Sequence, residues 1–229
     1  MSSYQPRVSV FVTRPNGATP RKVDEVERNK LTRASTLAND QLRNSSKPEV
    51  IYKHEDVDPA SVDRVIAWIK SIDFSRDVDN QSLTASFAGN NPSFEAVVKL
   101  HSTGYYMRVP AKLRGQPLES FIWEYMHQTT LSKAEFQLLW EWIPFSKQVK
   151  AAIDGLVYQK VHGPVPPEME EIEEYCRQQG LFDQVEECER RLLEIKEKKE
   201  KKAAEEAERR RKAAEYAASQ RGEGSGGAN

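Results

Sequence analysis

The stretch "EVIYKHEDVDPASVDRVIAWIKS" (Glu49–Ser71) has the clearest secondary-structure pattern in the chain. Its first residues favour β structure and follow a proline, which predicts a short strand. Asp58 is a good helix N-cap, and Pro59 would occupy the first helical position, where its missing N–H costs nothing. The apolar residues that follow recur at helical spacing: Val62, Val65, Ile66, Ile69 and Ile72, with Trp68 beside them. This helix needs a packing partner, so the stretch predicts a mixed α+β domain.

The residues before this stretch predict one more strand and a helical segment. "VSVFV" (Val8–Val12) alternates and is followed by the turn signal "RPNGATP", which predicts a strand at or near a sheet edge. The run 21–44 has few helix breakers and weak helical spacing through Val26, Leu31 and Leu42. We therefore expect it to be helical.

The residues after this stretch predict a mainly helical region. A polar loop with a candidate short strand at Leu83–Phe87 leads into a series of predicted helices. Ser132 with Glu135 three residues later is a capping-box signature. Pro144 would end that helix, and "HGPVPP" (162–167) would be a stiff linker. The predicted helices start at 94, 111, 117, 132 and 146.

Composition and charge exclude several classes of protein. The formal net charge of −1 gives no overall attraction to nucleic acid or to an anionic membrane. The first residues lack a signal-peptide pattern, and no apolar run approaches the roughly 20 residues that span a bilayer. Cys176 and Cys188 form neither a disulfide framework nor a zinc spacing. We expect no membrane association, and a location in the nucleus or cytoplasm.

The C-terminal third predicts a helical seam followed by a charged helix. An acidic helix ends at Gly180. A 4-3-4-3 spacing then follows, which is typical of a short coiled coil. The seam consists of Leu181, Val185, Cys188, Leu192 and Ile195, and it is the candidate partner-binding surface. The next positions in this register are Lys199 and Lys202, so the apolar seam ends there.

Within the charged helix, one basic run is a candidate phosphate contact. It consists of Arg209, Arg210, Arg211 and Lys212. Tyr216 is the only aromatic residue nearby, so a stacking mode for single-stranded nucleic acid is not indicated. A solvated helix remains the main alternative.

The sequence contains no recognisable catalytic constellation. His54, His101, His127 and His162 are scattered without metal-ligand spacing, and no glycine-rich loop follows a strand. Two aromatic clusters, "GYYM" (104–107) and "LWEW" (139–142), could cradle a ligand, but their helical spacing favours core positions. We therefore expect a non-enzymatic protein with no metal and no cofactor.

The order of elements resembles a BTB/POZ domain of the divergent fungal type. "VSVFV" stands where the family's first strand would be, and "LTRAS" (31–35) resembles the Leu-x-x-x-Ser that begins a helix. The stretch 49–69 resembles the next strand, its acidic turn and a helix. Residues 94–125 resemble the following helical pair, and 131–180 look like a helical extension. Two positions depart from the family pattern: Glu27–Arg28 replaces a histidine–lysine pair, and Lys70 replaces a tyrosine.

The resemblance implies an α+β protein-interaction domain, with a small sheet covered by helices and no catalytic site. In that family the first strand often forms a dimer interface, so Val8, Val10 and Val12 are candidates for a dimer edge. The expected organisation is a flexible start (1–7), the BTB-like domain (8–128), a helical extension (129–180), the charged helix (181–218) and a disordered tail (219–229).

Two functions compete at this point. The first is an adaptor or scaffold that binds other proteins, including a second copy of itself, through the BTB-like domain and the C-terminal helix. The alternative is a subunit of a nucleic-acid-associated assembly, in which the basic helix contacts RNA or DNA. Salt dependence separates them, because phosphate contacts weaken steeply as ionic strength rises.

Overall fold

The chain folds into two compact units, one of mixed α+β structure and one of helices. The computed structural model describes residues 5–76, 81–83, 92–114 and 116–223. The first unit is Met1–Ala152 and the second is Ile153–Asn229. The division falls within helix α8 (Lys147–His162), whereas the sequence predicted divisions after residues 128 and 180.

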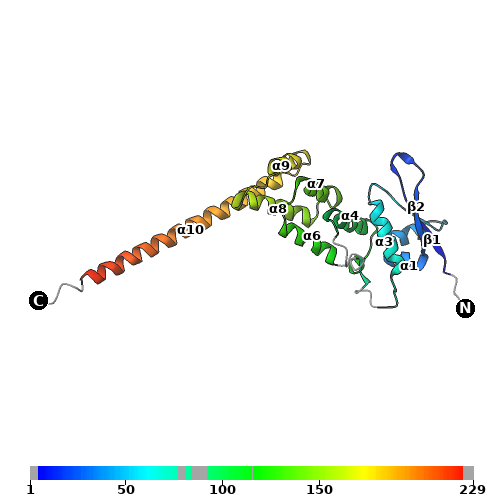
Figure 1. The fold of residues 1–229 in the computed structure, drawn as a ribbon, viewed down its shortest axis with the longest axis horizontal. Coiled ribbons are helices and arrows are strands. Elements are labelled where there is room, and N and C mark those ends of the chain that lie inside the picture. Colours follow the sequence, from blue (N-terminus) through cyan, green and yellow to red (C-terminus); the bar gives the residue numbers. More distant parts are fainter. Residues whose placement is uncertain (1–4, 77–80, 84–91, 115, 224–229) are drawn as a thin grey trace. The chain divides into compact units, whose positions relative to one another are not determined.

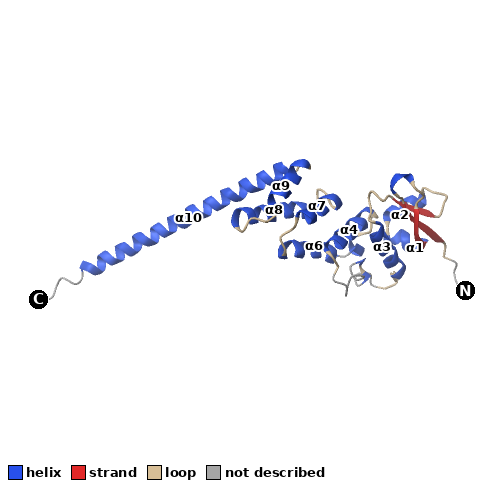
Figure 2. Ribbon diagram, turned by 45° about the horizontal axis from the view of Figure 1, so that its top comes forward, coloured by secondary structure: helices blue, strands red, loops and turns tan. Residues whose placement is uncertain are grey.

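The sheet of the first unit has β1 (Arg7–Val12) at its centre. It pairs antiparallel with β2 (Arg21–Glu27) and parallel with β3 (Glu49–Tyr52). Figure 1 labels β1 and β2, and Figure 2 shows the strands in red. The sequence predicted a strand at or near a sheet edge; β1 is the central strand and lies next to both edge strands. The side chains of Val8, Val10 and Val12 are buried. A turn signal after a strand shows where the strand ends, but not how many neighbours it has.

The expectation of a helical segment over residues 21–44 is wrong for its first part. Residues Arg21–Glu27 form β2, with a bulge where β1 passes from Val10 to Phe11. Pairing with β1 overrides the weak helical spacing, as tertiary context often does. The remainder forms α1 (Arg28–Ala34) and α2 (Thr36–Arg43), so here the expectation is confirmed.

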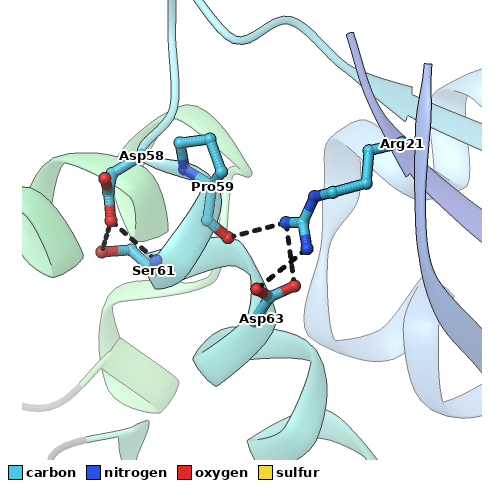
Figure 3. A network of polar contacts seen from close by, with 5 residues as sticks. All are labelled: Arg21, Asp58, Pro59, Ser61 and Asp63. Carbon is cyan, nitrogen blue, oxygen red and sulfur yellow. Dashed lines mark hydrogen bonds and ion pairs between the residues drawn. The ribbon is translucent and has the colours of Figure 1, made fainter. Parts of the chain in front are cut away.

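Helix α3 (Pro59–Ser71) forms as the sequence predicts and is tied to the sheet by polar contacts. The Asp58 carboxylate accepts hydrogen bonds from the Ser61 backbone N–H and hydroxyl, both at 2.8 Å. Figure 3 shows the Arg21 guanidinium of β2 donating to both carboxylate oxygens of Asp63, at 3.0 and 3.1 Å, and to the Pro59 carbonyl. The start of α3 is thereby fixed against β2.

Ser35 joins three elements of the first unit. It is the N-cap of α2, where its Oγ accepts a hydrogen bond from the Ala38 N–H at 3.1 Å. The same hydroxyl donates to the carbonyl of Met107 at 2.6 Å and lies 3.4 Å from the Tyr52 hydroxyl of β3. Ser35 and Tyr52 are fully buried, and burial raises the pKa of the Tyr52 hydroxyl to about 12.

The outer edge of β3 is covered by a side chain. The Gln41 amide of α2 accepts a hydrogen bond from the Ile51 N–H at 2.9 Å and donates one to the Ile51 carbonyl at 3.0 Å. These are the backbone groups that another strand would use. Gln41 therefore occupies the position of a further strand at this residue.

Helices complete the first unit. They are α4 (Phe94–Tyr106), α5 (Ala111–Arg114), α6 (Gln116–Gln128) and α7 (Lys133–Trp142). Helix α4 packs against α3, α6 and α7, which places it at the centre of the helical layer. The capping box of Ser132 and Glu135 is present at the start of α7. Of the candidate strand at Leu83–Phe87, only Leu83 lies within the described residues, and it is in a short helical turn.

The second unit packs the end of α8 with α9 (Met169–Gln178) and α10 (Phe182–Glu223). Gly180 adopts φ 71° between α9 and α10, a backbone conformation in which glycine is favoured. The Lys160 ammonium of α8 lies 2.7 Å from Glu173 of α9 and 2.9 Å from Glu189 of α10. Burial alone would lower the pKa of Lys160, but these two carboxylates outweigh it and the pKa is raised. One cation therefore links all three helices.

Candidate functional site

Two adjacent hollows lie on the surface of the first unit, and they share Tyr105, Tyr106 and Arg114. The first has a volume of about 690 Å³ and extends toward Leu37 and Pro110. The second has a volume of about 660 Å³ and extends over the loop between α7 and α8. Because their linings overlap, the hollows form one continuous surface on the last turn of α4.

Aromatic side chains stand exposed along this surface. Tyr105 is 65% exposed, Tyr106 is 41% exposed and Phe145 is 86% exposed; we call these residues the aromatic rim. The sequence favoured core positions for "GYYM", which is wrong for both tyrosines and right for Met107, which is buried. The buried apolar residues of α4 are Phe94, Val97, Val98 and Leu100. The two tyrosines come after them, at the C-terminal end of the helix, and their side chains are exposed to solvent.

Backbone strain coincides with the hollows. Among the described residues other than glycine, positive φ occurs at Asn16 (61°), Arg108 (53°) and Phe145 (58°). Asn16 lies in a turn and tolerates this conformation well, whereas arginine and phenylalanine do so rarely. Arg108 lines the first hollow and Phe145 lines the second. Strained residues of this kind cluster at functional sites.

Contacts on each side hold the two strained residues in place. The Arg108 carbonyl accepts hydrogen bonds from the Thr36 N–H and hydroxyl, both at 3.3 Å, and its guanidinium lies 3.4 Å from Asp40. The Phe145 ring lies edge-on to Trp140, with ring centroids 5.0 Å apart. Phe145 has no sequence signal of its own, because its exposure depends on how α7 and α8 meet.

Basic side chains surround the hollows. Arg108 lies in the first hollow, Lys147 in the second, and the Arg114 guanidinium lies 5.3 Å from the centre of the Tyr105 ring. The buried Gln148 amide donates to Glu119 at 3.3 Å. Burial lowers the pKa of His101, and the charge of Arg114 lowers it further. At neutral pH the lining therefore offers aromatic surface, cationic hydrogen-bond donors and an uncharged imidazole.

The structure divides the predicted partner-binding seam. Leu181, Val185 and Cys188 are buried within the second unit. Leu192 is half-buried, whereas Ile195 is 40% exposed and Leu193, which lies outside the predicted seam, is 43% exposed. The segment after Cys188 thus presents a partly exposed strip of Leu192, Leu193 and Ile195, which we call the exposed strip.

The other predicted site residues are placed differently. Val8, Val10 and Val12 face the interior of the first unit, so a dimer through them would require β1 to leave its sheet, and this role stays a prediction. The run Arg209–Lys212 lies on the exposed part of α10. Within it, Arg211 pairs with Glu208 and Glu215, and Lys212 pairs with Glu208.

The two cysteines are poor candidates for chemistry. Burial raises the pKa of both thiols to about 11, and for Cys188 a hydrogen bond to Asp154 at 3.0 Å acts in the same direction. Both thiols are therefore protonated at neutral pH and weakly nucleophilic. Within the described parts of the chain, histidine, cysteine and acidic residues do not gather into a group that could hold a metal ion.

Comparisons with known proteins found no relative. No protein-family model matches the chain, and neither the curated proteins nor the solved structures include a significant match. Among the described helices, none combines the length and the apolar character needed to cross a bilayer.

Proposed function

We propose that this protein is a non-enzymatic adaptor, and that its first unit binds an extended peptide segment of a partner protein across the two hollows. The observation that carries this proposal is Phe145, which combines positive φ with a ring that is 86% exposed. Neither property favours the isolated fold.

Phe145 carries a backbone cost that its exposed ring does not offset in the free protein. A residue other than glycine in this backbone region costs on the order of 1 kcal/mol. Burial of a phenylalanine ring is worth about 1.5–3 kcal/mol, but Phe145 leaves most of that unrealised in the free protein. A partner that covers the ring would recover this free energy. Glycine would suit the backbone better and would offer no contact surface.

The lining favours a peptide over a small metabolite. The hollows are open, continuous and bordered by the aromatic rim, which provides flat apolar contacts for successive side chains. Aromatic-lined grooves are a recurrent means of binding extended peptides. Arg108, Arg114 and Lys147 outnumber the acidic lining residues Asp56 and Glu119. We therefore propose a peptide that carries an acidic side chain.

The exposed strip of α10 supplies a second contact in this proposal. Leu192 and Ile195 continue the heptad spacing beyond the buried Cys188, and Leu193 lies beside them, so the fitting partner is another amphipathic helix. The BTB/POZ resemblance also remains part of the proposal. A small sheet covered by helices is the arrangement that the resemblance implies, and Ser35 of "LTRAS" is the N-cap of a helix.

The test is the substitution Phe145→Gly in the full-length protein, with a library of displayed peptides as the probe. We expect peptides selected on the unsubstituted protein to lose at least about tenfold in affinity, the equivalent of one buried aromatic contact. The melting temperature should stay the same or rise, because glycine relieves the backbone at position 145.

Asn16→Gly is the matched control. It changes another residue with positive φ, in a turn that lines neither hollow, and it should leave peptide affinity unchanged. Unchanged peptide binding by Phe145→Gly would refute the proposed surface. A clear fall in the melting temperature of Phe145→Gly would show instead that the Phe145 ring stabilises the fold by packing against Trp140.

A further inference from the structure

The outer part of α10 is a fully exposed charged helix, and its charges follow a repeat. Every described side chain from Glu197 to Tyr216 is exposed. Residues 194–203 and 205–214 match in charge at most positions. The matching pairs are Glu194 and Glu205, Glu197 and Glu208, Lys198 and Arg209, Lys199 and Arg210, Lys201 and Lys212, and Ala203 and Ala214. Eleven residues are close to three helical turns, so each pair lies on one face, about 16 Å apart along the axis.

The spacing gathers several basic side chains on one side of the helix. At 100° per residue, one side carries a basic face made of Lys198, Lys199, Lys202, Arg209 and Arg210. Glu206 lies between the two halves of this face. The roughly opposite side carries Glu197, Glu200, Glu208 and Glu215, together with Lys201 and Arg211. The small net charge of the segment therefore conceals a face on which five basic residues outnumber Glu206.

The ion pairs in this part of α10 involve basic residues outside the basic face. Arg211 and Lys212 form ion pairs with Glu208, and Arg211 also pairs with Glu215. None of the five residues of the basic face takes part in an ion pair within the described structure. Such a charged surface attracts an anionic partner without first breaking an internal contact.

We propose that the basic face of α10 binds the phosphate backbone of double-stranded nucleic acid, a function additional to peptide binding. A rigid helix presents the clusters Lys198/Lys199/Lys202 and Arg209/Arg210 at a fixed spacing, which suits a rigid, regularly charged duplex. Single strands are usually held by stacked aromatic residues, and this face carries none in its two clusters. A membrane surface would require large apolar residues on the other side of the helix, where alanine and glutamate stand.

The experiment measures binding of full-length protein to a labelled duplex DNA of about 20 base pairs at about 50 mM salt. The test variant is Lys198→Glu/Lys202→Glu/Arg209→Glu, whose three residues lie within a narrow arc of the basic face. We expect it to lose at least about tenfold in affinity. The slope of log affinity against log salt should become shallower by about 3, one for each phosphate contact.

The control variant is Lys201→Glu/Arg211→Glu/Lys212→Glu. It makes the same change in net charge on the same helix, mainly at residues that already have ion-pair partners. We expect it to lose less than about threefold. Circular dichroism on both variants checks that helix content is equal. Equal losses in the two variants would overturn the proposed face, because net charge alone would then explain binding.

Two further measurements complete the test. The same protein is offered a single strand of equal length, and vesicles that contain anionic lipid. Duplex binding stronger than both supports the proposal. Tighter binding to the single strand or to vesicles, or no binding to duplex at low salt, overturns it. Because the variants lie outside the hollows, failure here leaves the peptide-binding proposal unaffected.

Discussion

Ser35 connects more of the first unit than its size suggests. Its hydroxyl caps α2, satisfies the buried Met107 carbonyl and meets the Tyr52 hydroxyl. We expect Ser35→Ala to lower the free energy of unfolding by about 2–3 kcal/mol. Loss of a cap accounts for about 1 kcal/mol, and a buried carbonyl without a partner accounts for the remainder. Urea denaturation of both proteins measures the difference.

Ser93→Ala provides the comparison for Ser35. Ser93 also caps a helix, accepting from the Ala96 N–H at 3.2 Å, but it is exposed, and within the described residues no side-chain hydrogen bond joins it to another element. Its loss should cost about 0.5–1 kcal/mol. Equal costs for the two substitutions would mean that the Met107 contact adds nothing to stability.

His101 should make the first unit sensitive to mild acid. Burial, aided by Arg114, holds the pKa of His101 below its usual value of 6.5. Below that pH the unfolded chain binds a proton that the folded chain resists, so stability falls as pH decreases. Between about pH 7.5 and about pH 5.5, before most carboxylates titrate, His101→Gln should show a smaller loss of unfolding free energy than the unsubstituted protein. Parallel pH profiles would rule this contribution out.

At the scale of elements, α10 changes its role along its length. Val185 is 3% exposed and Ile195 is 40% exposed, although both belong to the same predicted seam. We expect Val185→Asp to destabilise the second unit by about 3 kcal/mol or more, because it buries an unpaired charge. Ile195→Asp should change the free energy of unfolding of the second unit by less than about 1 kcal/mol. It should, however, weaken the binding of a helical partner protein. Thermal melts, followed by a partner-binding assay, separate the two effects.

A larger loss of stability for Ile195→Asp than for Val185→Asp would mean that the buried part of α10 does not end after Cys188. If Ile195→Asp unfolded the second unit, the exposed strip would be part of its core. If Val185→Asp were harmless, the seam would not hold α10 to α8 and α9 at all.

Local chemistry predicted most helices, and it failed where pairing depends on distant residues. Asp58 with Pro59, and Ser132 with Glu135, specify helix starts within a few residues of sequence, and both are present. Strand β2 was missed because its residues become a strand only by pairing with β1. The central place of β1 was missed for the same reason.

For the whole molecule, the candidate site was harder to predict than the fold. The seam was visible because its residues share one spacing, although that spacing cannot say where burial ends. The hollows bring together Thr36, Tyr105, Arg114 and Phe145 from separate parts of the first unit. No spacing in the sequence links them, and the positive φ of Phe145 depends on the angle at which the chain enters α8.

The Gln41 amide at the edge of β3 also has a consequence for synthesis. Gln41 precedes Ile51 in the chain, so the ribosome makes the covering side chain before the strand that it covers. No later segment of the chain has to be synthesised before this part of the edge can be covered. Once α2 has folded against β3, the Ile51 backbone groups are closed to a neighbouring nascent chain.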